Sequence, residues 1–229
     1  MIIAIHQPNF FPWMGYFDKI ARADVFVFLD GVDFPKNSWV NRVRIAVQGE
    51  GRWLTCPVQR AGLATPISEI RVDDTRDWRR RMLKTLQANY ARAAHFEPLM
   101  AEVSAMIAPP EDRLAEINMA AIRKVSAALG LATRFEQQTR LAVSGRSNDL
   151  LASIVQACGG DTYLMGGGAG GYHDEAPFAA AGIRVMQQAF QAAPYGPEGA
   201  FLPGLSVLDY LMHDGRPLTP RGADQVTVR

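Results

Sequence analysis

The first thirty residues of the chain follow the pattern strand, helix, strand. Ile2–Ile5 is a short and wholly apolar run, which is typical of a strand buried on both faces of a parallel sheet. Pro12 suits the first turn of a helix, and large apolar residues then recur at helical spacing as far as Ile20. Asp24–Asp30 (DVFVFLD) is a second apolar run. Two strands joined through a helix form a βαβ unit, so the sequence predicts a mainly parallel sheet.

The middle of the chain has a different pattern, which predicts a small antiparallel β insertion at about residues 43–73. Two β-prone runs flank the sequence QGEG, whose glycines can adopt the positive φ angles of a hairpin turn. The sequence ISEIRV, residues 67–72, is predicted as a third strand of this insertion.

The rest of the chain alternates helices with strands. Predicted helices cover residues 77–90, 97–107, 112–129, 147–158 (with Ser147 as N-cap), 176–181 and 205–215, and predicted strands cover 133–139, 162–166 and 183–190. The predicted fold class is therefore α/β, a Rossmann-like three-layer sandwich with about five mostly parallel strands and the antiparallel insertion. Residues 1–216 are predicted to form a single domain, followed by a poorly ordered C-terminal tail at 217–229.

Composition and charge argue against several classes of protein. The chain has 24 basic and 23 acidic residues, whereas DNA-binding domains usually show a concentrated basic surplus. Cys56 and Cys158 form no CxxC motif and the four histidines form no HxxxH motif, so no disulfide framework or metal site is expected. The chain begins without signal-peptide features, and no apolar run reaches the roughly 20 residues of a membrane helix. We expect a cytoplasmic protein without a DNA partner, a bound metal or membrane insertion.

Polar residues follow two predicted strands at the edge where open α/β sheets bind ligands. His6 and Gln7 follow the first strand, and Asp30 ends the second. Because neighbouring parallel strands end at the same edge of a sheet, His6 and Asp30 are expected within reach of one site. An imidazole paired with a carboxylate is a common acid or base near neutral pH, which makes these two residues the candidate catalytic pair. The alternative is that His6 and Gln7 only satisfy backbone groups in a tight turn.

The loop Asp30–Arg42 is the candidate substrate-binding loop because it combines unlike polar side chains with an aromatic one. Lys36 and Arg42 could hold a phosphate or a carboxylate. Trp39 could stack on a base or a sugar ring. The alternative is an ordinary solvated loop, but its position directly after a sheet strand favours binding.

The glycine-rich sequence Gly166–Gly171 follows a predicted strand and matches G-x-G-x-x-G through Gly166, Gly168 and Gly171. No acidic residue for a ribose ends the next predicted strand, and the motif lies late in the chain. We therefore interpret the loop as a backbone-lined site for an anion or a sugar rather than for NAD. Tyr172 closes this loop and is expected to face the same crevice.

Two further stretches have mainly structural interpretations. Ser206, Asp209 and His213 share one face of a predicted helix, but a hydrolase triad is assembled from separate elements. Capping and surface hydrogen bonds are therefore the favoured roles of these residues. Trp78–Lys84 (WRRRMLK) is interpreted as a solvated helical face.

Five stretches of the chain resemble the WbqC-like protein family. They are residues 4–45 (AIHQPNFFPWMGYFDKIARADVFVFLDGVDFPKNSWVNRVRI), 53–58 (WLTCPV), 78–90 (WRRRMLKTLQANY), 161–172 (DTYLMGGGAGGY) and 202–215 (LPGLSVLDYLMHDG). Family members are encoded in gene clusters for O-antigen and related surface polysaccharides. The resemblance implies a cytosolic enzyme that acts on a sugar nucleotide or its amino-sugar precursor.

The resemblance also implies which positions are functional. They are His6, Gln7, Trp13, Asp30, Lys36, Asn37, Trp39, Asn41, Arg42, Gly166, Gly168 and Tyr172. Where the family commonly has Ser-Gly before the glycine loop, this chain has Met165-Gly166, so no serine role carries over. A fainter similarity to nucleotidyltransferase-like adenylating enzymes lacks their H-x-G-H pair and their KMSKS-like lysine loop.

The leading hypothesis is a transferase that modifies an amino sugar or sugar nucleotide by acyl or aminoacyl transfer. His6 would be the general base, oriented by Asp30, while Lys36 and Arg42 hold an acidic substrate and the glycine loop seats the donor. The donor is left open between a nucleotide and an acyl carrier, and a homo-oligomer is also left open. The alternatives are a non-catalytic sugar- or nucleotide-binding partner in a biosynthetic complex, and a nucleotidyltransferase-like adenylating enzyme.

Overall fold

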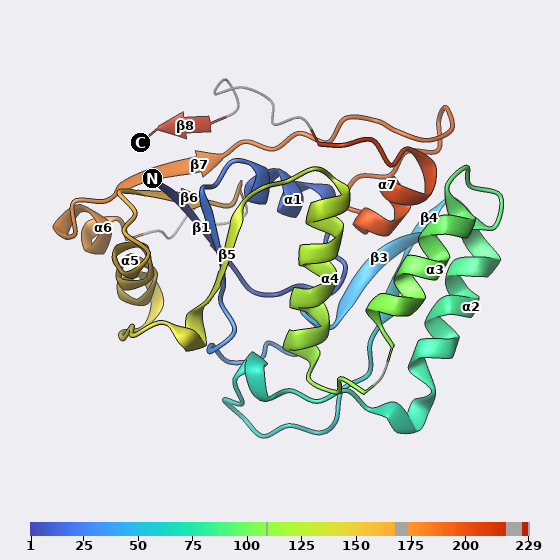
Figure 1. Cartoon of the computed structure of the whole chain (residues 1–229), viewed down its shortest axis with the longest axis horizontal. Helices are drawn as coiled ribbons and strands as arrows, with labels where there is room; N and C mark the ends of the chain where they lie inside the picture. The colour runs from blue at the N-terminus through green and yellow to red at the C-terminus, as the bar shows by residue number, and fades with distance from the viewer. Residues whose placement is uncertain (109, 168–173, 219–225, 229) are drawn as a thin grey trace.

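The computed structural model describes residues 1–108, 110–167, 174–218 and 226–228, and a six-stranded sheet forms its centre (Figure 1). The strands lie in the order β5-β2-β1-β6-β7-β8. Five of them are parallel, and β8 pairs antiparallel with β7 at one edge. Their bounds are Ile2–His6 (β1), Val25–Phe28 (β2), Arg134–Gln137 (β5), Thr162–Met165 (β6), Arg184–Gln188 (β7) and Val226–Val228 (β8). The predicted α/β class and mostly parallel sheet are confirmed.

Helices cover both faces of the sheet because its central strands are apolar on both sides. Successive side chains of a strand point to opposite faces, so each strand contributes to two separate apolar clusters. Phe26 and Phe28 pack with α1 (Met14–Ala21) and α4 (Leu114–Ala128). On the opposite face, Val25 and Val27 pack with α5 (Ser147–Ala157) and α6 (Ala176–Ala180). This arrangement is the predicted three-layer sandwich.

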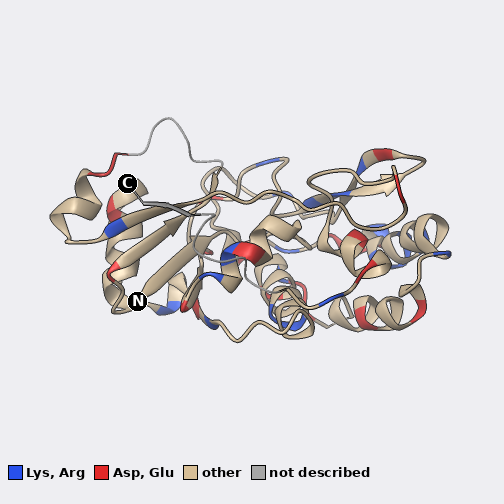
Figure 2. Ribbon diagram, turned by 90° about the horizontal axis from the view of Figure 1, so that it is seen from above, with Lys and Arg blue, Asp and Glu red and all other residues tan. Residues whose placement is uncertain are grey.

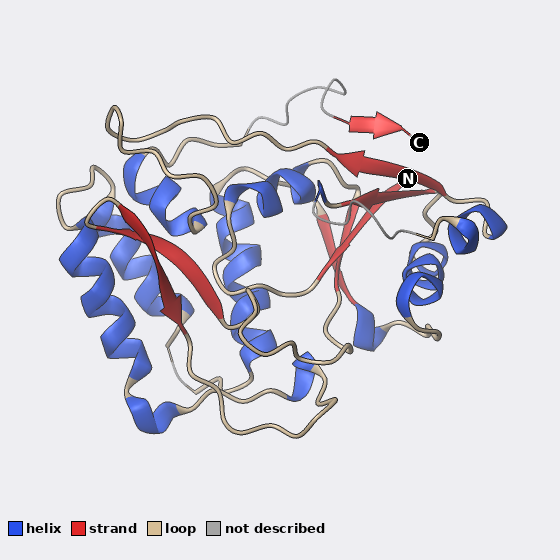
Figure 3. Ribbon diagram, turned by 180° about the vertical axis from the view of Figure 1, so that it is seen from behind, coloured by secondary structure: helices blue, strands red, loops and turns tan. Residues whose placement is uncertain are grey.

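The antiparallel insertion lies at the end of the molecule away from α5 and α6 (Figure 3). It is a two-stranded ribbon of β3 (Arg42–Val47) and β4 (Glu50–Thr55). The helices α2 (Trp78–Tyr90), α3 (Phe96–Met106) and α7 (Val207–His213) lie around the ribbon. The predicted hairpin is therefore confirmed.

The predicted third strand of the insertion is wrong. Ile67–Glu69 forms a single 3₁₀ turn, and both Ile67 and Ile70 are buried. Two inward residues spaced three apart fit a turn of helix, whereas a strand would send them to opposite faces. Isolated bridges, such as that between Val58 and Val72, and single backbone hydrogen bonds to loops tie this segment to its neighbours.

Two details near helix and chain ends differ from expectation. Ser147 is the first residue of α5, with φ at +49°, and no side chain caps that helix. The segment predicted as a tail contributes β8, which pairs with β7. The division into one domain and a tail stays a prediction.

The direction in which strands are added reverses at β1. The chain places β2 and β5 on one side of β1, and β6 and β7 on the other. In open α/β sheets, ligands bind at such a switch point, in the crevice beyond the carboxyl ends of the strands. The carboxyl ends of β1 and β6 are therefore the expected place for a site.

Charged residues of both signs occur along the ribbon in the sheet half and in the helical half of the molecule (Figure 2). Within the described ranges, no helix has both the length and the apolar character needed to span a bilayer.

Candidate functional site

A pocket of about 650 Å³ lies at the switch point, where β1, β6 and β7 end beside the first turn of α1. It is lined by His6, Trp13, Gly15, Tyr16, Lys19, Gly166, Gly167, Gln187, Gln188, Ala189 and Phe190. Three of the predicted site residues, His6, Trp13 and Gly166, thus come together. No carboxylate belongs to the described lining, so the pocket suits a neutral or anionic ligand.

The turn from β1 to α1 has a strained backbone that presents Trp13 to this pocket. Phe11 has a φ of +40°, and a bulky residue in the left-handed region costs about 1–3 kcal/mol. Two hydrogen bonds hold the turn in place. The amide of Phe10 donates to the carbonyl of Trp39 at 2.9 Å, and the hydroxyl of Ser206 donates to the carbonyl of Phe11 at 2.7 Å.

We expect Ser206→Ala to lower the free energy of unfolding by about 1–2 kcal/mol, because this hydroxyl has two roles. It anchors the strained turn, and it also accepts a hydrogen bond from the amide of Leu208 as the N-cap of α7. Urea unfolding measures the loss. Ser104→Ala, at an exposed position of α3, is the matched control, and an equally small effect of both changes would contradict this role.

His6 is held as a neutral imidazole. Its Nδ1 lies 3.1 Å from the carbonyl oxygen of Gln7. Since a carbonyl can only accept, Nδ1 carries the proton and Nε2 keeps its lone pair. Burial, together with the charge of Lys19, lowers the pKa of His6 to about 3. The imidazole is therefore a hydrogen-bond acceptor at neutral pH, but a weak base.

Lys19 is the ionisable group of the pocket whose pKa lies closest to neutral pH. Its side chain is 3% exposed, and its Nζ donates to the carbonyl of Ile5 at 2.8 Å, at the end of β1. A Cβ added to Gly166 would lie 3.9 Å from Nζ, so the amine sits directly beside the start of the glycine loop. Burial lowers the pKa of Lys19 to about 7. A large fraction of the amine is therefore neutral at physiological pH.

The acidic neighbour of Lys19 in sequence does not neutralise it. Asp18 forms an ion pair with Arg22 at 2.8 Å and accepts a hydrogen bond from Nε2 of Gln188 at 2.7 Å. The same Nε2 donates to the carbonyl of Gly15 at 2.8 Å, which fixes β7 against α1. The carboxylate of Asp18 is therefore bound by Arg22 and Gln188, and it does not belong to the lining of the pocket that contains Lys19.

Gly15 keeps the pocket open at the start of α1. A Cβ at this position would lie 2.7 Å from Nε1 of Trp13 and 2.8 Å from Cδ1 of Phe190. Since real Cβ atoms do not approach other atoms so closely, only glycine permits both aromatic rings to line the pocket as they do.

The carboxylate of Asp30 makes its hydrogen bonds at the end of β5 and not with His6, and the expected catalytic pair stays a prediction. Asp30 is fully buried, and its carboxyl oxygens accept hydrogen bonds from Nε2 of Gln137 at 2.6 Å and from the hydroxyl and the amide of Thr139 at 2.8 and 3.1 Å. Asp30 therefore joins the end of β2 to the end of β5, on the side of β2 away from β1.

Four further residues of the predicted binding loop, Lys36, Asn37, Asn41 and Trp39, divide into three groups, and Arg42 lies on β3. Lys36 and Asn37 are exposed, and Lys36 borders a different pocket together with Arg60. Asn41 is buried and donates to the carbonyl of Cys56 at 3.2 Å. Trp39 packs against Trp13, with ring centroids 5.1 Å apart, so it continues the aromatic wall of the main pocket.

Other predicted positions have backbone roles or lie outside the described residues. The main-chain oxygen of Gln7 accepts from His6 and, at 2.9 Å, from the hydroxyl of Tyr16. Gly166 lines the pocket, whereas Gly168, Gly171 and Tyr172 lie outside the residues that the structure describes.

Ser206, Asp209 and His213 do not form a triad. Ser206 is fully buried in its capping role, and Asp209 accepts a hydrogen bond from the hydroxyl of Tyr90 at 2.7 Å. The ring of His213 packs against that of Tyr90 at a centroid distance of 5.9 Å. The capping role of Ser206 is confirmed, but the hydrogen bonds of Ser206 and Asp209 are buried rather than at the surface.

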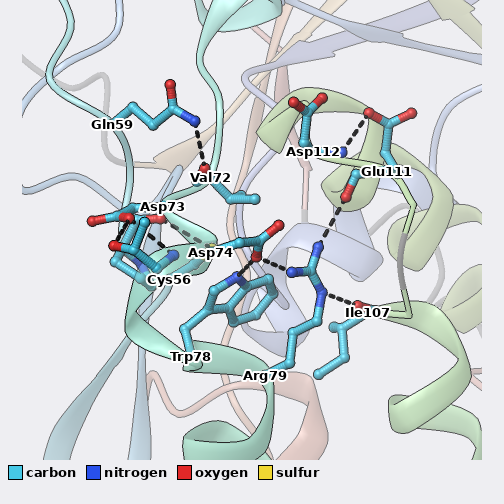
Figure 4. A network of polar contacts seen from close by, with 12 residues as sticks. Cys56, Gln59, Val72, Asp73, Asp74, Trp78, Arg79, Ile107, Glu111 and Asp112 are labelled. Atoms are coloured by element: carbon cyan, nitrogen blue, oxygen red, sulfur yellow. Dashed lines mark hydrogen bonds and ion pairs between the residues drawn. The ribbon is translucent and has the colours of Figure 1, made fainter.

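A separate polar network joins α2 to the loop before α4 (Figure 4). Arg79 donates to the carbonyls of Ile107 at 2.6 Å and Glu111 at 2.9 Å, and it pairs with Asp74. Asp74 also accepts from the indole of Trp78 at 2.9 Å, and Trp78 is buried. The interpretation of this stretch as a solvated face is therefore wrong for Trp78 and Arg79. Across the described parts of the chain, no three His, Cys, Asp or Glu side chains gather as a metal site requires.

Sequence reasoning missed Lys19 and the residues at the end of β7 and just after it. Lys19 lies three positions after Tyr16, on the same face of α1, and this spacing was an available signal. Gln187, Gln188 and Phe190 come from a strand end that the sequence left without a role. Their proximity to His6 depends on β6 lying between β1 and β7, which is a property of strand order.

Comparisons with known proteins agree on one family. The model of the WbqC-like protein family matches residues 7–219. An uncharacterized protein of Mycobacterium tuberculosis, Rv1507c, is 32% identical over 221 residues, which cover 93% of this chain and 94% of that protein. No solved structure matches the chain. The chain belongs to the WbqC-like protein family.

Proposed function

We propose that the protein is a cytoplasmic transferase of surface-polysaccharide (O-antigen) biosynthesis, which moves an acyl or aminoacyl group onto an amino sugar or its sugar nucleotide. One observation carries this proposal. The buried amine of Lys19, with a pKa of about 7, faces a pocket at the switch point whose described lining contains no carboxylate. Membership of the WbqC-like family supplies the biosynthetic context.

The chemistry that suits this arrangement is proton removal from an attacking amine. The amino group of the sugar attacks the carbonyl carbon of the donor, a C–N bond forms, and the bond to the donor's leaving group breaks. The proton lost by the attacking nitrogen passes to the neutral amine of Lys19. A base with a pKa near the working pH is the most effective in such a step.

His6 has a different role in this proposal from the one expected from the sequence. With its pKa at about 3, the imidazole stays neutral, and its Nε2 accepts a hydrogen bond that orients the substrate. The backbone around Gly166 and Gly167 is proposed to seat the phosphate or thioester end of the donor, since both glycines line the pocket and Gly166 lies beside the amine of Lys19.

The second candidate, a non-catalytic binding partner, is favoured by the aromatic wall of Trp13 and Trp39. Binding proteins often hold sugars on such surfaces, and they need no base. The two candidates differ in what the amine of Lys19 does, because a binder would keep its affinity and show no turnover in any variant.

Thermal-shift screening tests the ligand class. Sugar nucleotides, amino sugars, ATP and acyl-CoA are added separately and then in donor–acceptor pairs. A ligand at a hundredfold excess over its Kd raises the free energy of unfolding by about 2.7 kcal/mol, which is several degrees in Tm for a chain of this size. We expect stabilisation by an amino sugar or its nucleotide, and product formation in one donor pair. Stabilisation by ATP alone, with pyrophosphate release, would instead support the adenylating alternative.

A further inference from the structure

The outward face of the β3–β4 ribbon carries two arginines and a tryptophan. Strand alternation sends Val43 and Leu54 to the core, so Arg42, Arg44 and Trp53 face away from it. Trp53 lies directly opposite Arg44, and 47% of its surface is exposed. The guanidinium carbon of Arg42 lies 4.2 Å from the centre of the Trp53 ring, which is a cation–π contact.

This face is continuous with the main pocket through a series of tryptophans. The ring centroids of Trp53 and Trp39 are 5.1 Å apart, and those of Trp39 and Trp13 are also 5.1 Å apart. Trp13 lines the pocket. We call Trp13, Trp39, Trp53, Arg42 and Arg44 the aromatic–arginine strip.

Ser206 holds the ribbon and the pocket in a fixed relation. Its amide donates to the carbonyl of Arg44 at 2.8 Å, and its hydroxyl donates to the carbonyl of Phe11 at 2.7 Å. It also forms an isolated bridge with Trp13. The two ends of the strip are therefore connected by hydrogen bonds to the main chain rather than by packing alone, as a pre-organised binding surface requires.

The two arginines of the strip have unused hydrogen-bonding capacity. Within the part of the chain that the structure describes, neither guanidinium pairs with a carboxylate, and the acidic residue of β4, Glu50, pairs with Arg52 at 2.7 Å. Nε of Arg42 is buried without a hydrogen-bond partner. A Cβ at Gly51 would overlap the guanidinium of Arg44, so the glycine makes room for that side chain to lie against the ribbon.

We infer that the strip binds the sugar acceptor, and that this acceptor is anionic. Its ring stacks on Trp53 and packs against the edge of Trp39, whose plane lies at 66° to that of Trp53, while a carboxylate or a phosphate is bound by Arg42 and Arg44. A guanidinium group can donate two parallel hydrogen bonds to either anion. A neutral sugar would offer Arg42 and Arg44 no anionic acceptor. With the sugar bound to the strip, its reactive amino group lies in the pocket beyond Trp13, next to the amine of Lys19. This inference rests on the proposed function and adds the charge of the substrate to it.

Calorimetric titration of the full chain tests the inference with methyl glucuronide, glucose 1-phosphate and neutral methyl glucoside. At least one acidic sugar is expected to bind about tenfold more tightly than the neutral one, and Arg42→Gln and Arg44→Gln should each remove about that advantage. Binding of the glucuronide alone assigns a carboxylate to the strip, and binding of the phosphate alone assigns a phosphate. Trp53→Ala should weaken both the acidic and the neutral sugars.

Arg52→Gln is the matched control because Arg52 lies on the same ribbon and is paired with Glu50. Equal affinity for acidic and neutral sugars, full affinity in Arg42→Gln, or an equal loss in Arg52→Gln would each overturn the inference. Tighter binding of a single-stranded oligonucleotide through the same residues would also overturn it. Lys19→Met separates the two proposals: it should keep acidic-sugar binding. Full turnover in Lys19→Met would contradict the proposed catalytic function but would not contradict anion binding by the strip.

Discussion

Replacing Lys19 with methionine should lower turnover by about 10²–10⁴-fold, which is the range that a positioned acid or base contributes. The fold should persist, because methionine is unbranched, apolar and adaptable, and the position is already 3% exposed. Initial rates with the donor–acceptor pair found by thermal-shift screening measure the effect. Lys84→Met, at an exposed position of α2, is the matched control and should leave the rate unchanged.

Two further readouts distinguish proton transfer from a structural role of Lys19. The rate of the wild type should rise with pH through about 7, as the amine of Lys19 loses its proton. Lys19→Ala should regain part of its turnover when ethylamine is added, since the small amine can occupy the vacated space and accept the proton. Full activity in Lys19→Met, or a rate independent of pH between 6 and 8 with chemistry limiting, would contradict the assignment.

The same lowered pKa predicts how stability depends on pH. Between pH 7 and 10.5 the unfolded chain still binds a proton on this lysine, whereas the folded chain has released it. Stability rises with pH wherever the unfolded state binds more protons, so this group makes the wild type progressively more stable across that window. Lys19→Met should lack this contribution, which urea unfolding at several pH values can measure without any substrate.

The strands of the sheet could be predicted because burial on both faces leaves a simple sequence signal. The apolar runs of β1, β2 and β6 contain few polar residues, and the βαβ pattern restricts how they pair. The strand prediction for ISEIRV is wrong because β-branched residues favour strands only weakly, and the surrounding loop decides the outcome. Ile67 donates its amide to the carbonyl of Val32, and this contact with a distant loop cannot be read from local sequence.

The location of the site could be predicted from the sequence, but the contacts of Lys19 and Asp30 could not. His6 could be placed in it because a residue directly after a buried parallel strand lies at the edge of the sheet where ligands bind. Lys19 was missed because a lysine in an amphipathic helix is normally solvated. Here its Nζ instead contacts residues far apart in the chain: the carbonyl of Ile5, the ring of Tyr163 and the backbone near Gly166. Neighbouring strand ends suggested that Asp30 would face His6. Strand proximity does not fix which neighbour a side chain turns toward, and here the partners lie at the end of β5 and just beyond it.

Asp30→Ala should lower the free energy of unfolding by about 3 kcal/mol, because removing the carboxyl group leaves buried donors without an acceptor. Three hydrogen bonds converge on it, from Nε2 of Gln137 and from the hydroxyl and the amide of Thr139. The backbone pairing of Phe28 with Gln137 would then remain to hold the ends of β2 and β5 together. Urea unfolding measures the change, and Asp33→Ala, in the exposed part of the following loop, should have little effect.

A double-mutant cycle with Thr139→Val separates this structural role from the catalytic role that the sequence suggested. If Asp30 acts through Thr139, the two substitutions should be non-additive by about 1 kcal/mol or more, as expected for residues in one hydrogen-bond network. Turnover per folded molecule should then stay near the wild-type value in Asp30→Asn, because its polar contacts lie around β5 rather than in the pocket. Additive stabilities together with a large loss of turnover would instead place Asp30 in the chemistry, and would require that the end of β2 rearranges toward His6 when substrate binds.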